Sequence, residues 1–325
     1  MSTFNLKPRI RILNAEFSRF SCNAINKIDS LGDVTHVDAN RDYLIKNIKY
    51  YDIIIIAIDN FIDREILKFA QNLKIIVTPT TGINHIDLIA ANEFNIKIIS
   101  LKGETEFLKS ISATAEHTWG MLLCLQRKIN LAHNHVLKGF WNREEFSGNE
   151  LRGKVLGIIG FGRLGEMVAD YANAFGMKVI AYDKRKIHNN AQFVTLDELL
   201  HKSDIISVHL SLSKTTKNFL DLEKVLELKK NPLLINTSRG EIIDENALVY
   251  ALENNLISGA ALDVLPGEVS TDKAWLKNSL LWQYANNNDN LLLTPHIGGV
   301  TMESVENTNL FIINKLKDYI KKVFS

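Results

Sequence analysis

The chain has 325 residues, of which 46% are hydrophobic and 23% are charged. This length and composition predict about two domains with substantial cores and argue against intrinsic disorder. Lys and Arg number 38 against 37 Asp and Glu, a net charge of +1, so no broad positive field would attract nucleic acid or an anionic membrane.

The cysteines and the N-terminal segment bear on the compartment. Cys22 and Cys124 lie far apart in no metal-ligand spacing, as is typical of a chain that matures in a reducing compartment. The first residues carry charges and Pro8 where a signal peptide would need an apolar run. The apolar run at 53–58 is too short to cross a bilayer. We expect a cytoplasmic protein without a disulfide, a bound metal or a membrane segment.

Short apolar runs alternate with helical patterns along the first third of the chain. The predicted strands are residues 9–14, 52–58, 74–78 and 96–100. Helical segments at 63–71 and 87–94 have apolar residues at spacings of three and four. This alternation predicts βα units around a parallel sheet.

A long helical stretch at 114–138 interrupts this rhythm before a second α/β series begins. Its predicted strands are residues 154–159, 178–182, 205–209, 232–236, 259–263 and 291–293. A final helix at 302–322 has no strand after it. The chain is therefore expected to pass between two domains through helices.

A glycine fingerprint follows the first strand of the second series. Gly160, Gly162 and Gly165 form G-x-G-x-x-G at the start of a predicted helix. The first glycine permits a tight turn, the second lets the backbone approach a pyrophosphate, and the third lets the helix pack on the strand. On its own the motif is weak, and the alternative is an ordinary glycine-rich turn.

An acidic residue supplies the missing context. Asp183 ends the next predicted strand, roughly 20 residues after the first glycine, where a carboxylate binds the ribose hydroxyls of a dinucleotide. A carboxylate there repels a 2′-phosphate and so favours NAD over NADP. The cations at 184–186 weaken this preference, although a solvated turn explains them more simply.

Three further segments each place a polar residue at the end of an apolar strand. They are residues 234–240 (LINTSRG), 259–268 (GAALDVLPGE) and 292–299 (LLTPHIGG). From about residue 75 to the C-terminus, the chain resembles the D-isomer-specific 2-hydroxyacid dehydrogenases, which carry an Arg, a Glu and a His in these contexts. The resemblance implies that Arg239, Glu268 and His296 are catalytic.

The chemistry of 2-keto acid reduction needs the same residue types. A guanidinium holds a carboxylate through two parallel hydrogen bonds, which suits Arg239. Histidine both donates and accepts protons near neutral pH, which suits His296. A neighbouring carboxylate, Glu268, orients the ring and stabilises its charged form. Taken singly, each residue is equally well a surface arginine, a loop acid or a structural histidine.

The resemblance also implies a set of residues that line the cofactor. It places Asp263 near the nicotinamide, with strand capping as the alternative, and makes His209 a cofactor neighbour. The complete predicted NAD site comprises Gly160, Gly162, Arg163, Leu164, Gly165, Asp183, His209, Thr237, Asp263 and Gly298.

On the substrate side, residues 78–87 (TPTTGINHID) resemble the family's loop whose backbone amides receive the substrate carboxylate. Thr80, Thr81 and Gly82 are the expected donors, and an ordinary strand-to-helix turn is the alternative. Arg64, Lys102 and Lys109 are candidate partners for a second anionic group, or solvated charges. The chain departs from the family in longer segments at 103–114 and 269–290, which leaves the identity of the acid open.

These expectations combine into one interpretation. The fold class is α/β, with two doubly wound parallel-sheet domains and a Rossmann NAD domain (119–296) inserted into a flavodoxin-like substrate domain (1–118 and 297–325). The resemblance implies an NAD-dependent oxidoreductase of a small 2-hydroxy or 2-keto acid of D configuration, and a homodimer formed through the helices before the fingerprint. The rivals are an NADH-sensing, corepressor-like binding module and a family enzyme acting on formate or phosphite.

Overall fold

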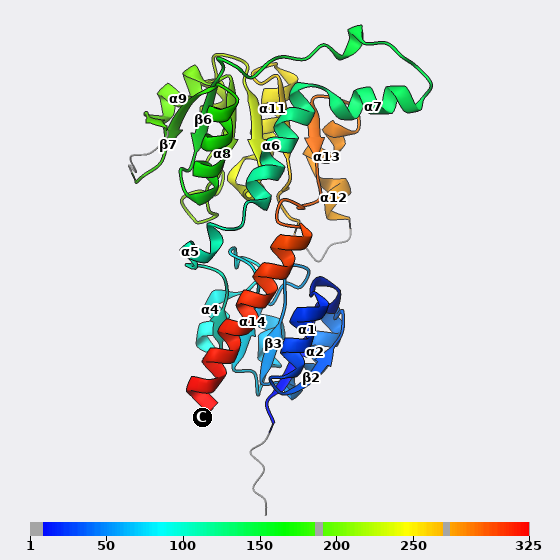
Figure 1. The fold of residues 1–325 in the computed structure, drawn as a ribbon, viewed down its shortest axis with the longest axis vertical. Coiled ribbons are helices and arrows are strands. Elements are labelled where there is room, and N and C mark those ends of the chain that lie inside the picture. The colour runs from blue at the N-terminus through cyan, green and yellow to red at the C-terminus, as the bar shows by residue number, and fades with distance from the viewer. Residues whose placement is uncertain (1–8, 186–190, 269–273, 325) are drawn as a thin grey trace, which may run out of the picture. The chain divides into compact units, whose positions relative to one another are not determined.

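The computed structural model describes residues 9–185, 191–268 and 274–324. The chain divides into two compact units, one from residues 1–110 with 300–325 and the other from residues 111–299. Figure 1 colours the first unit blue to cyan, with its C-terminal helix in red, and the second unit green to orange. No helix in the described ranges is long and apolar enough to span a bilayer.

The first unit is built on five parallel strands in the order β2-β1-β3-β4-β5. The strands are β1 (Arg11–Asn14), β2 (Asp33–His36), β3 (Ile53–Ile55), β4 (Ile75–Val77) and β5 (Lys97–Ile99). The helices are α1 (Cys22–Asp29), α2 (Arg41–Asn47), α3 (Arg64–Lys68), α4 (Leu88–Glu93), α5 (Thr105–Leu108) and α14 (Met302–Phe324). This strand order is that of flavodoxin-like folds.

Sequence pattern explains these elements locally. The central strands β3 and β4 are fully apolar and buried, as expected for strands covered by helices on both faces. Asp63 and Asp87 cap α3 and α4 by accepting backbone N–H groups of the first turn. The edge strand β2 was not predicted, because its partly exposed sequence DVTH lacks an apolar run.

The second unit holds seven parallel strands in the order β12-β11-β10-β9-β6-β7-β8. The strands are β6 (Val155–Ile159), β7 (Lys178–Tyr182), β8 (Gln192–Phe193), β9 (Ile205–Val208), β10 (Leu233–Asn236), β11 (Gly259–Leu262) and β12 (Leu291–Leu293). The helices are α6 (Ala113–Gln126), α7 (Ile129–Leu137), α8 (Arg163–Ala174), α9 (Leu196–Lys202), α10 (Leu222–Leu226), α11 (Glu245–Glu253), α12 (Trp275–Asn278) and α13 (Leu280–Ala285). Counted from β6, the order is the Rossmann order with one added strand.

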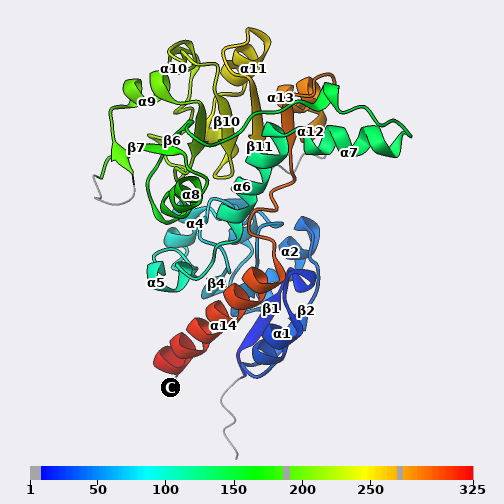
Figure 2. The same ribbon diagram turned by 45° about the horizontal axis from the view of Figure 1, so that its top comes forward.

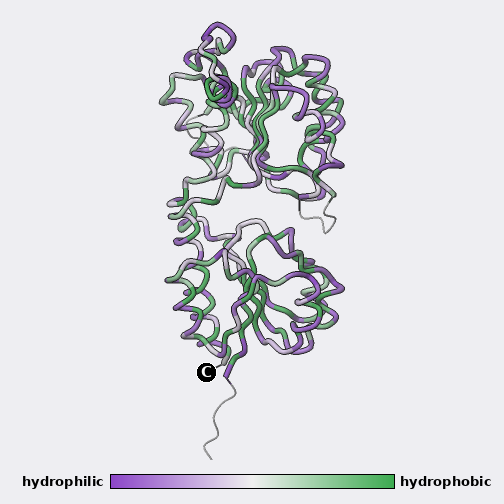
Figure 3. The backbone as a smooth tube through the Cα atoms, turned by 90° about the vertical axis from the view of Figure 1, so that its right-hand side faces the viewer, coloured by the Kyte–Doolittle hydropathy of each residue, from purple (hydrophilic) through white to green (hydrophobic). Residues whose placement is uncertain are grey.

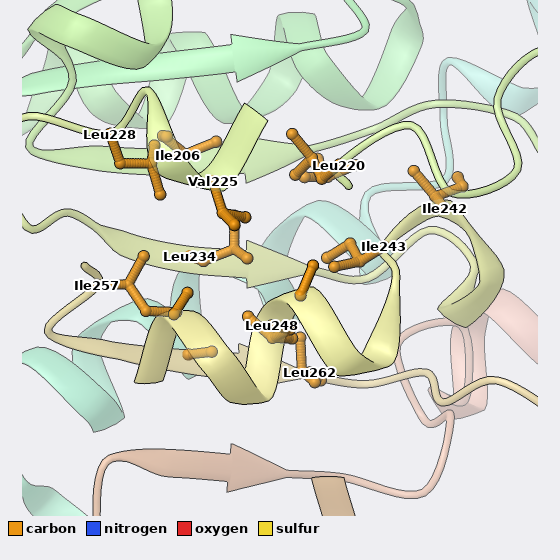
Figure 4. Packing of buried hydrophobic residues seen from close by; sticks show 14 of the residues in the cluster. Ile206, Leu220, Val225, Leu228, Leu234, Ile242, Ile243, Leu248, Ile257 and Leu262 are labelled. Carbon is orange, nitrogen blue, oxygen red and sulfur yellow. The ribbon is translucent and has the colours of Figure 1, made fainter. Parts of the chain in front are cut away.

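Helices cover both faces of this sheet (Figure 2). Alternate residues of one strand enter different cores: Ile159 packs with α9, α10 and α11, whereas Ile158 packs with α6 and α8. Figure 4 shows the first core, where Val225, Leu234 and Leu248 meet between the strands and α11. Hydrophobic segments accordingly lie in the strands of each unit (Figure 3). The predicted fold class is confirmed.

Two expected segments differ from the structure. The single helical stretch at 114–138 is two helices, α6 and α7, because Lys128 adopts a left-handed φ of 52° between them. The segment at 274–290, expected as a long loop, contains α12 and α13, and its first part at 269–273 lies outside the described residues. Ser279 caps α13 through its hydroxyl, a signal that the sequence carried.

Candidate active site

The predicted polar residues of the second unit gather at one edge of its sheet. The fingerprint follows β6, and Asp183, His209, Thr237, Asp263 and His296 follow β7, β9, β10, β11 and β12 in turn. All these strands are parallel, so their carboxyl ends share one edge, where open α/β sheets bind ligands.

The fingerprint forms a tight turn from β6 into α8. Gly160 has φ +93°, and a Cβ there would lie 2.7 Å from the carbonyl oxygen of His209. A Cβ on Gly165 would lie 2.5 Å from the Gly160 carbonyl oxygen, so this glycine lets the helix pack against the turn. Around Gly162, by contrast, the space is open. The N–H groups of the first turn of α8 therefore follow a stretch of backbone that a ligand can approach.

Asp183 is tied to this turn. Its carboxylate accepts the backbone N–H of Phe161 on one oxygen and that of Arg185 on the other, both at 2.8 Å. The Asp183 side chain is 13% exposed and the Arg185 side chain 74% exposed. Asp183 therefore orders the glycine turn and leaves acceptor capacity for further donors, while Arg185 is solvated; Lys186 lies outside the described residues.

Arg239 lies on the loop after β10, held from two sides. Asn236, 1% exposed, donates its side-chain N–H to the Arg239 carbonyl at 2.9 Å. A Cβ on Gly240 would lie 2.1 Å from the carbonyl carbon of Leu265. The absence of a side chain at position 240 therefore lets this loop pack closely on the loop that leads to Glu268. Burial lowers the pKa of the Arg239 guanidinium, and the charge of Glu268 opposes that shift. A cation kept in such a place favours an anionic partner.

His296 and Glu268 form an ion-pair contact. Nδ1 of the imidazole lies 2.8 Å from Oε1 of the carboxylate, with side-chain exposures of 30% and 14%. Because Nδ1 is engaged, Nε2 is the ring atom left to exchange a proton, and it has no hydrogen-bond partner among the described residues.

The backbone at His296 is strained and is held by hydrogen bonds to Asp263. Its φ of 52° lies in the left-handed region, which costs a non-glycine residue roughly 1–3 kcal/mol. Asp263, 1% exposed, accepts the backbone N–H of Ile297 at 2.9 Å and that of Gly298 at 2.7 Å. The N–H of His296 itself donates to the Asp263 carbonyl at 2.8 Å. Asp263 thus fixes the loop that carries His296.

His209 and Thr237 occupy the ends of β9 and β10. Burial lowers the pKa of His209 to about 4, and its ring bonds the Ser207 hydroxyl at 2.8 Å. Its Nδ1 atom is buried and has no hydrogen-bond partner in the part of the chain that the structure describes. Thr237, 5% exposed, bonds the hydroxyl of Thr118 at 2.7 Å. His209 is therefore uncharged at neutral pH, which suits a neighbour of a dinucleotide more than a proton donor.

In the first unit, Thr80, Thr81 and Gly82 lie in the loop after β4. The Thr80 hydroxyl donates to the Gly82 carbonyl at 2.7 Å and meets the Thr78 hydroxyl at 2.9 Å. In the described part of the chain, no hydrogen bond is donated by the backbone N–H of Thr80, Thr81 or Gly82. Three N–H groups without a protein partner in one turn are open to an anion.

The candidate cations for a second anionic group differ in their pairing. Arg64 makes two hydrogen bonds to the Glu93 carboxylate, and Lys109 pairs with Glu106 at 2.8 Å. Lys102 has no ion pair among the described residues, and its neighbour Leu101 donates its N–H to the Thr80 carbonyl at 3.0 Å. Of the three, Lys102 is the cation adjacent to the N–H donors.

Sequence reasoning missed three residues of this site. Asn236 holds the Arg239 loop, and His117 and Thr294 both bond Asp263. Asn236 carried a signal, because it is a polar residue that ends an apolar strand. His117 lies on a helix far from Asp263 in sequence, so only the tertiary structure brings them together.

The residues present fit a bound dinucleotide. A glycine turn with open space at Gly162, the N-terminus of α8 and a carboxylate at the end of β7 provide for pyrophosphate and ribose. The buried Nδ1 atom of His209, unpaired among the described residues, marks a further polar position at the same edge. No group of three potential metal ligands occurs among the described residues.

Comparison with known proteins agrees with this geometry. Residues 119–298 match the family model described as "D-isomer specific 2-hydroxyacid dehydrogenase, NAD binding domain". A hydroxypyruvate reductase of Thermotoga maritima is 34% identical over 286 residues, which cover 87% of this chain and 90% of that protein. The chain belongs to the D-isomer-specific 2-hydroxyacid dehydrogenase family.

Further members of the family extend the likeness. A D-3-phosphoglycerate dehydrogenase of Methanocaldococcus jannaschii is 32% identical over 92% of this chain, which spans 56% of that longer protein. The structure of a D-lactate dehydrogenase from Aquifex aeolicus, solved with NAD and lactic acid, has a TM-score of 0.84 at 28% identity and matches 96% of each chain.

As a member of this family, the protein is an NAD-dependent oxidoreductase that transfers a hydride between the cofactor and a small 2-hydroxy or 2-keto acid. The relatives are named as reductases and dehydrogenases, which supports the enzyme and not the corepressor-like alternative.

Proposed function

We propose that Arg239, Glu268 and His296 are the catalytic residues of this dehydrogenase. The observation that carries the proposal is the contact of 2.8 Å between His296 Nδ1 and Glu268 Oε1, with the Glu268 loop packed on the loop of the partly buried Arg239. Each of the three comes from the carboxyl end of a different parallel strand. This is the arrangement by which open α/β sheets assemble sites from distant sequence.

Arg239 binds the substrate carboxylate and polarises the adjacent carbonyl. Its guanidinium is buried, so its attraction for an anion is screened less than that of a surface arginine. The planar fork gives two parallel hydrogen bonds and fixes the orientation of the acid. Asn236 keeps the loop in place through the Arg239 carbonyl.

His296 supplies the proton in reduction and removes it in oxidation. Nε2 is the exchanging atom because Nδ1 is bonded to Glu268. The carboxylate stabilises the charge that the ring carries before reduction and gains during oxidation. The hydrogen bonds from the Ile297 and Gly298 N–H groups to Asp263 hold the His296 ring in place despite its left-handed backbone.

NAD supplies the hydride acceptor or donor when it is bound. We assign Gly160, Gly162, Arg163, Leu164 and Gly165 to its pyrophosphate, on the turn and first helical turn of α8. Asp183 serves its ribose, and the residues at the remaining strand ends face the rest of the cofactor: His209, Thr237, Asp263 and Gly298. Burial lowers the pKa of Arg163, whose side chain donates to the Ile111 carbonyl at 2.6 Å, so its backbone is the part assigned to phosphate.

The N–H donors of Thr80, Thr81 and Gly82 are assigned to the substrate carboxylate. Their lack of partners among the described residues supports this assignment. The named substrates of relatives include hydroxypyruvate, glyoxylate and phosphoglycerate. We propose an uncharged or small polar substituent on the acid, since Arg64 and Lys109 are already paired and, of the three candidate cations in the described ranges, Lys102 alone lacks an ion pair.

NADH oxidation by the purified protein across a panel of 2-keto acids tests this function. The panel comprises glyoxylate, pyruvate, hydroxypyruvate, a phosphorylated three-carbon acid and branched-chain acids. We expect turnover with an unphosphorylated acid, and Lys102→Ala should leave it unchanged. A clear preference for the phosphorylated acid that Lys102→Ala abolishes would overturn the substrate proposal. Silence across the panel with NADH bound would contradict a small substrate.

We also propose a cytoplasmic homodimer with unit 2 as the NAD domain and unit 1 as the substrate domain. Support for the dimer comes from the arm, residues 129–146, which extends away from the sheet of its unit in Figures 1 and 2. The arm exposes large apolar side chains, including Leu137 at 71%, Phe140 at 58% and Trp141 at 87%. Such a patch typically marks a protein interface.

A further inference from the structure

His117 on α6 makes a partly buried link to the loop that carries His296. Its Nε2 lies 3.1 Å from Oδ1 of Asp263 and 3.1 Å from the hydroxyl oxygen of Thr294. The Thr294 hydroxyl donates to the same carboxylate oxygen at 2.6 Å. The Thr294 hydroxyl already donates its proton to Asp263. The Nε2–H of His117 is therefore the donor that the Thr294 hydroxyl oxygen and Oδ1 of Asp263 share.

Asp263 therefore accepts bonds from four groups. Oδ1 accepts the His117 ring, the Thr294 hydroxyl and the N–H of Ile297, and Oδ2 accepts the N–H of Gly298. The carboxylate is 1% exposed, so these donors replace the water that it lost on burial. Removal of one donor leaves a buried anion less well satisfied and frees it to shift.

The next residue of α6 acts on the neighbouring strand end. Thr118 donates its hydroxyl proton to the Thr114 carbonyl at 2.7 Å and bonds the Thr237 hydroxyl at 2.7 Å. Thr237 lies two residues before Arg239. Consecutive residues of one rigid helix thus contact the ends of both β10 and β11, and α6 packs against both strands.

This link explains how a strained histidine is kept in place. The left-handed φ of 52° at His296 persists only if the surroundings fix it, and the two N–H groups that follow it are held by Asp263. Asp263 is in turn oriented by a helix that packs against the sheet, so the constraint runs from α6 through the carboxylate to the loop.

We propose that His117 is a positioning residue for the reaction: its Nε2–H donor fixes Asp263, and Asp263 fixes the backbone that aims His296. This inference rests on the proposed catalytic role of His296. His117 itself needs no contact with substrate or cofactor. Its contribution is therefore expected in kcat, because a small misplacement of a proton donor slows the chemical step more than it weakens binding.

The test compares His117→Phe, which removes the donor and keeps a ring, with His117→Gln, which restores an N–H donor. With glyoxylate and hydroxypyruvate as probes, we expect His117→Phe to lower kcat roughly 10- to 100-fold. The Kd for NADH, followed by fluorescence, should rise by a smaller factor than kcat falls, since of the assigned cofactor residues the variant displaces Asp263 and Gly298 alone, and His117→Gln should recover most of kcat. Thr294→Val, which removes the other side-chain donor, should resemble His117→Phe.

His201→Phe is the matched control, because His201 also donates to a carboxylate, Glu227 at 3.0 Å, but at an exposed site in the same unit. It should leave kcat unchanged. His296→Ala is measured in parallel: an active His296→Ala enzyme contradicts the proposed function. If His296→Ala is inactive but His117→Phe and Thr294→Val both keep a normal kcat, the positioning role is contradicted and the proposed function is not.

Crystal structures of the variants give a readout that needs no turnover. We expect residues 294–298 of His117→Phe to shift and His296 to leave its left-handed conformation or lose its contact with Glu268. In His117→Gln the loop should be native. An unchanged loop in His117→Phe, or a Gln variant as displaced as the Phe variant, would overturn the proposal.

Discussion

Nδ1 of His296 lies 2.8 Å from Oε1 of Glu268, which leaves Nε2 as the ring nitrogen open to a ligand. The loop that carries Glu268 also packs on the loop that carries Arg239, because Gly240 lets the β10 loop touch the backbone at Leu265, three residues before Glu268. A side chain at position 240 would separate them. The proposed site therefore depends on backbone contacts as much as on charged groups.

The proton donor can be removed without disturbing the dinucleotide site. We predict that His296→Ala lowers kcat for keto acid reduction by about 10²- to 10⁴-fold, since general acid catalysis contributes that much. NADH affinity, measured by fluorescence titration, should stay within about threefold. A variant with near-normal kcat would eliminate His296 as the donor.

Arginine at 239 should not be replaceable by lysine. Arg239→Lys keeps the charge but loses the bidentate fork, and a buried ammonium is desolvated at greater cost. We expect kcat/KM to fall at least about 10²-fold, with most of the effect in KM if Arg239 mainly binds the carboxylate. Arg152→Lys, at an exposed arginine of the same unit, is the control and should behave as wild type.

Asp183 holds the glycine turn and is proposed to bind the ribose, and two variants are compared to separate these roles. Asp183→Ala removes the ribose acceptor and also the partner of the Phe161 N–H. We predict that it lowers the preference for NADH over NADPH at least about tenfold and weakens both cofactors. Asp183→Asn keeps an acceptor oxygen for the turn and should lose preference with less loss of affinity. An unchanged cofactor ratio in both would show that Asp183 does not contact the ribose.

We predict that the folded protein loses stability in acid because of His209. Its pKa is lowered to about 4 by burial, whereas an unfolded histidine has a pKa near 6.5. The unfolded state therefore binds more protons between these values, and stability falls as the pH drops from about 6.5 towards 4. The loss attributable to this ring is on the order of 2 kcal/mol at pH 4.5.

Denaturation at pH 7 and pH 4.5 tests this expectation. His209→Gln should lose less stability than the wild type over the interval, because glutamine does not titrate. His133→Gln, at an exposed histidine of α7, should behave as the wild type. Equal acid sensitivity in the wild type and His209→Gln would mean that His209 titrates normally.

The arm offers a direct test of the dimer. Leu137→Ser combined with Trp141→Ser removes two exposed apolar side chains and should yield monomers in analytical ultracentrifugation. Leu222→Ser, at a leucine of α10 that is 47% exposed, is the matched control and should leave the mass unchanged. A wild-type protein that sediments as a monomer would refute the proposed dimer.

Strongly patterned elements could be predicted from the sequence, and weakly patterned ones could not. Apolar runs such as 53–58 and 154–159 predict buried strands because a parallel sheet covered on both faces requires them. The strands β2 and β8 lie at sheet edges, where partial exposure removes the pattern. The break between α6 and α7 was not predicted, because the left-handed residue there is Lys128 and not a glycine, which would have indicated such a conformation.

The sequence by itself determined the chemistry available to this protein: which strand ends carry an arginine, an acid and a histidine, and where glycines permit a dinucleotide to approach. Those features are local and survive as short motifs. The tertiary structure alone decided how the groups are held, because the contacts of Asp263 with His117 and of Thr237 with Thr118 span more than a hundred residues. No local pattern records a hydrogen bond between a helix and strand ends so far along the chain.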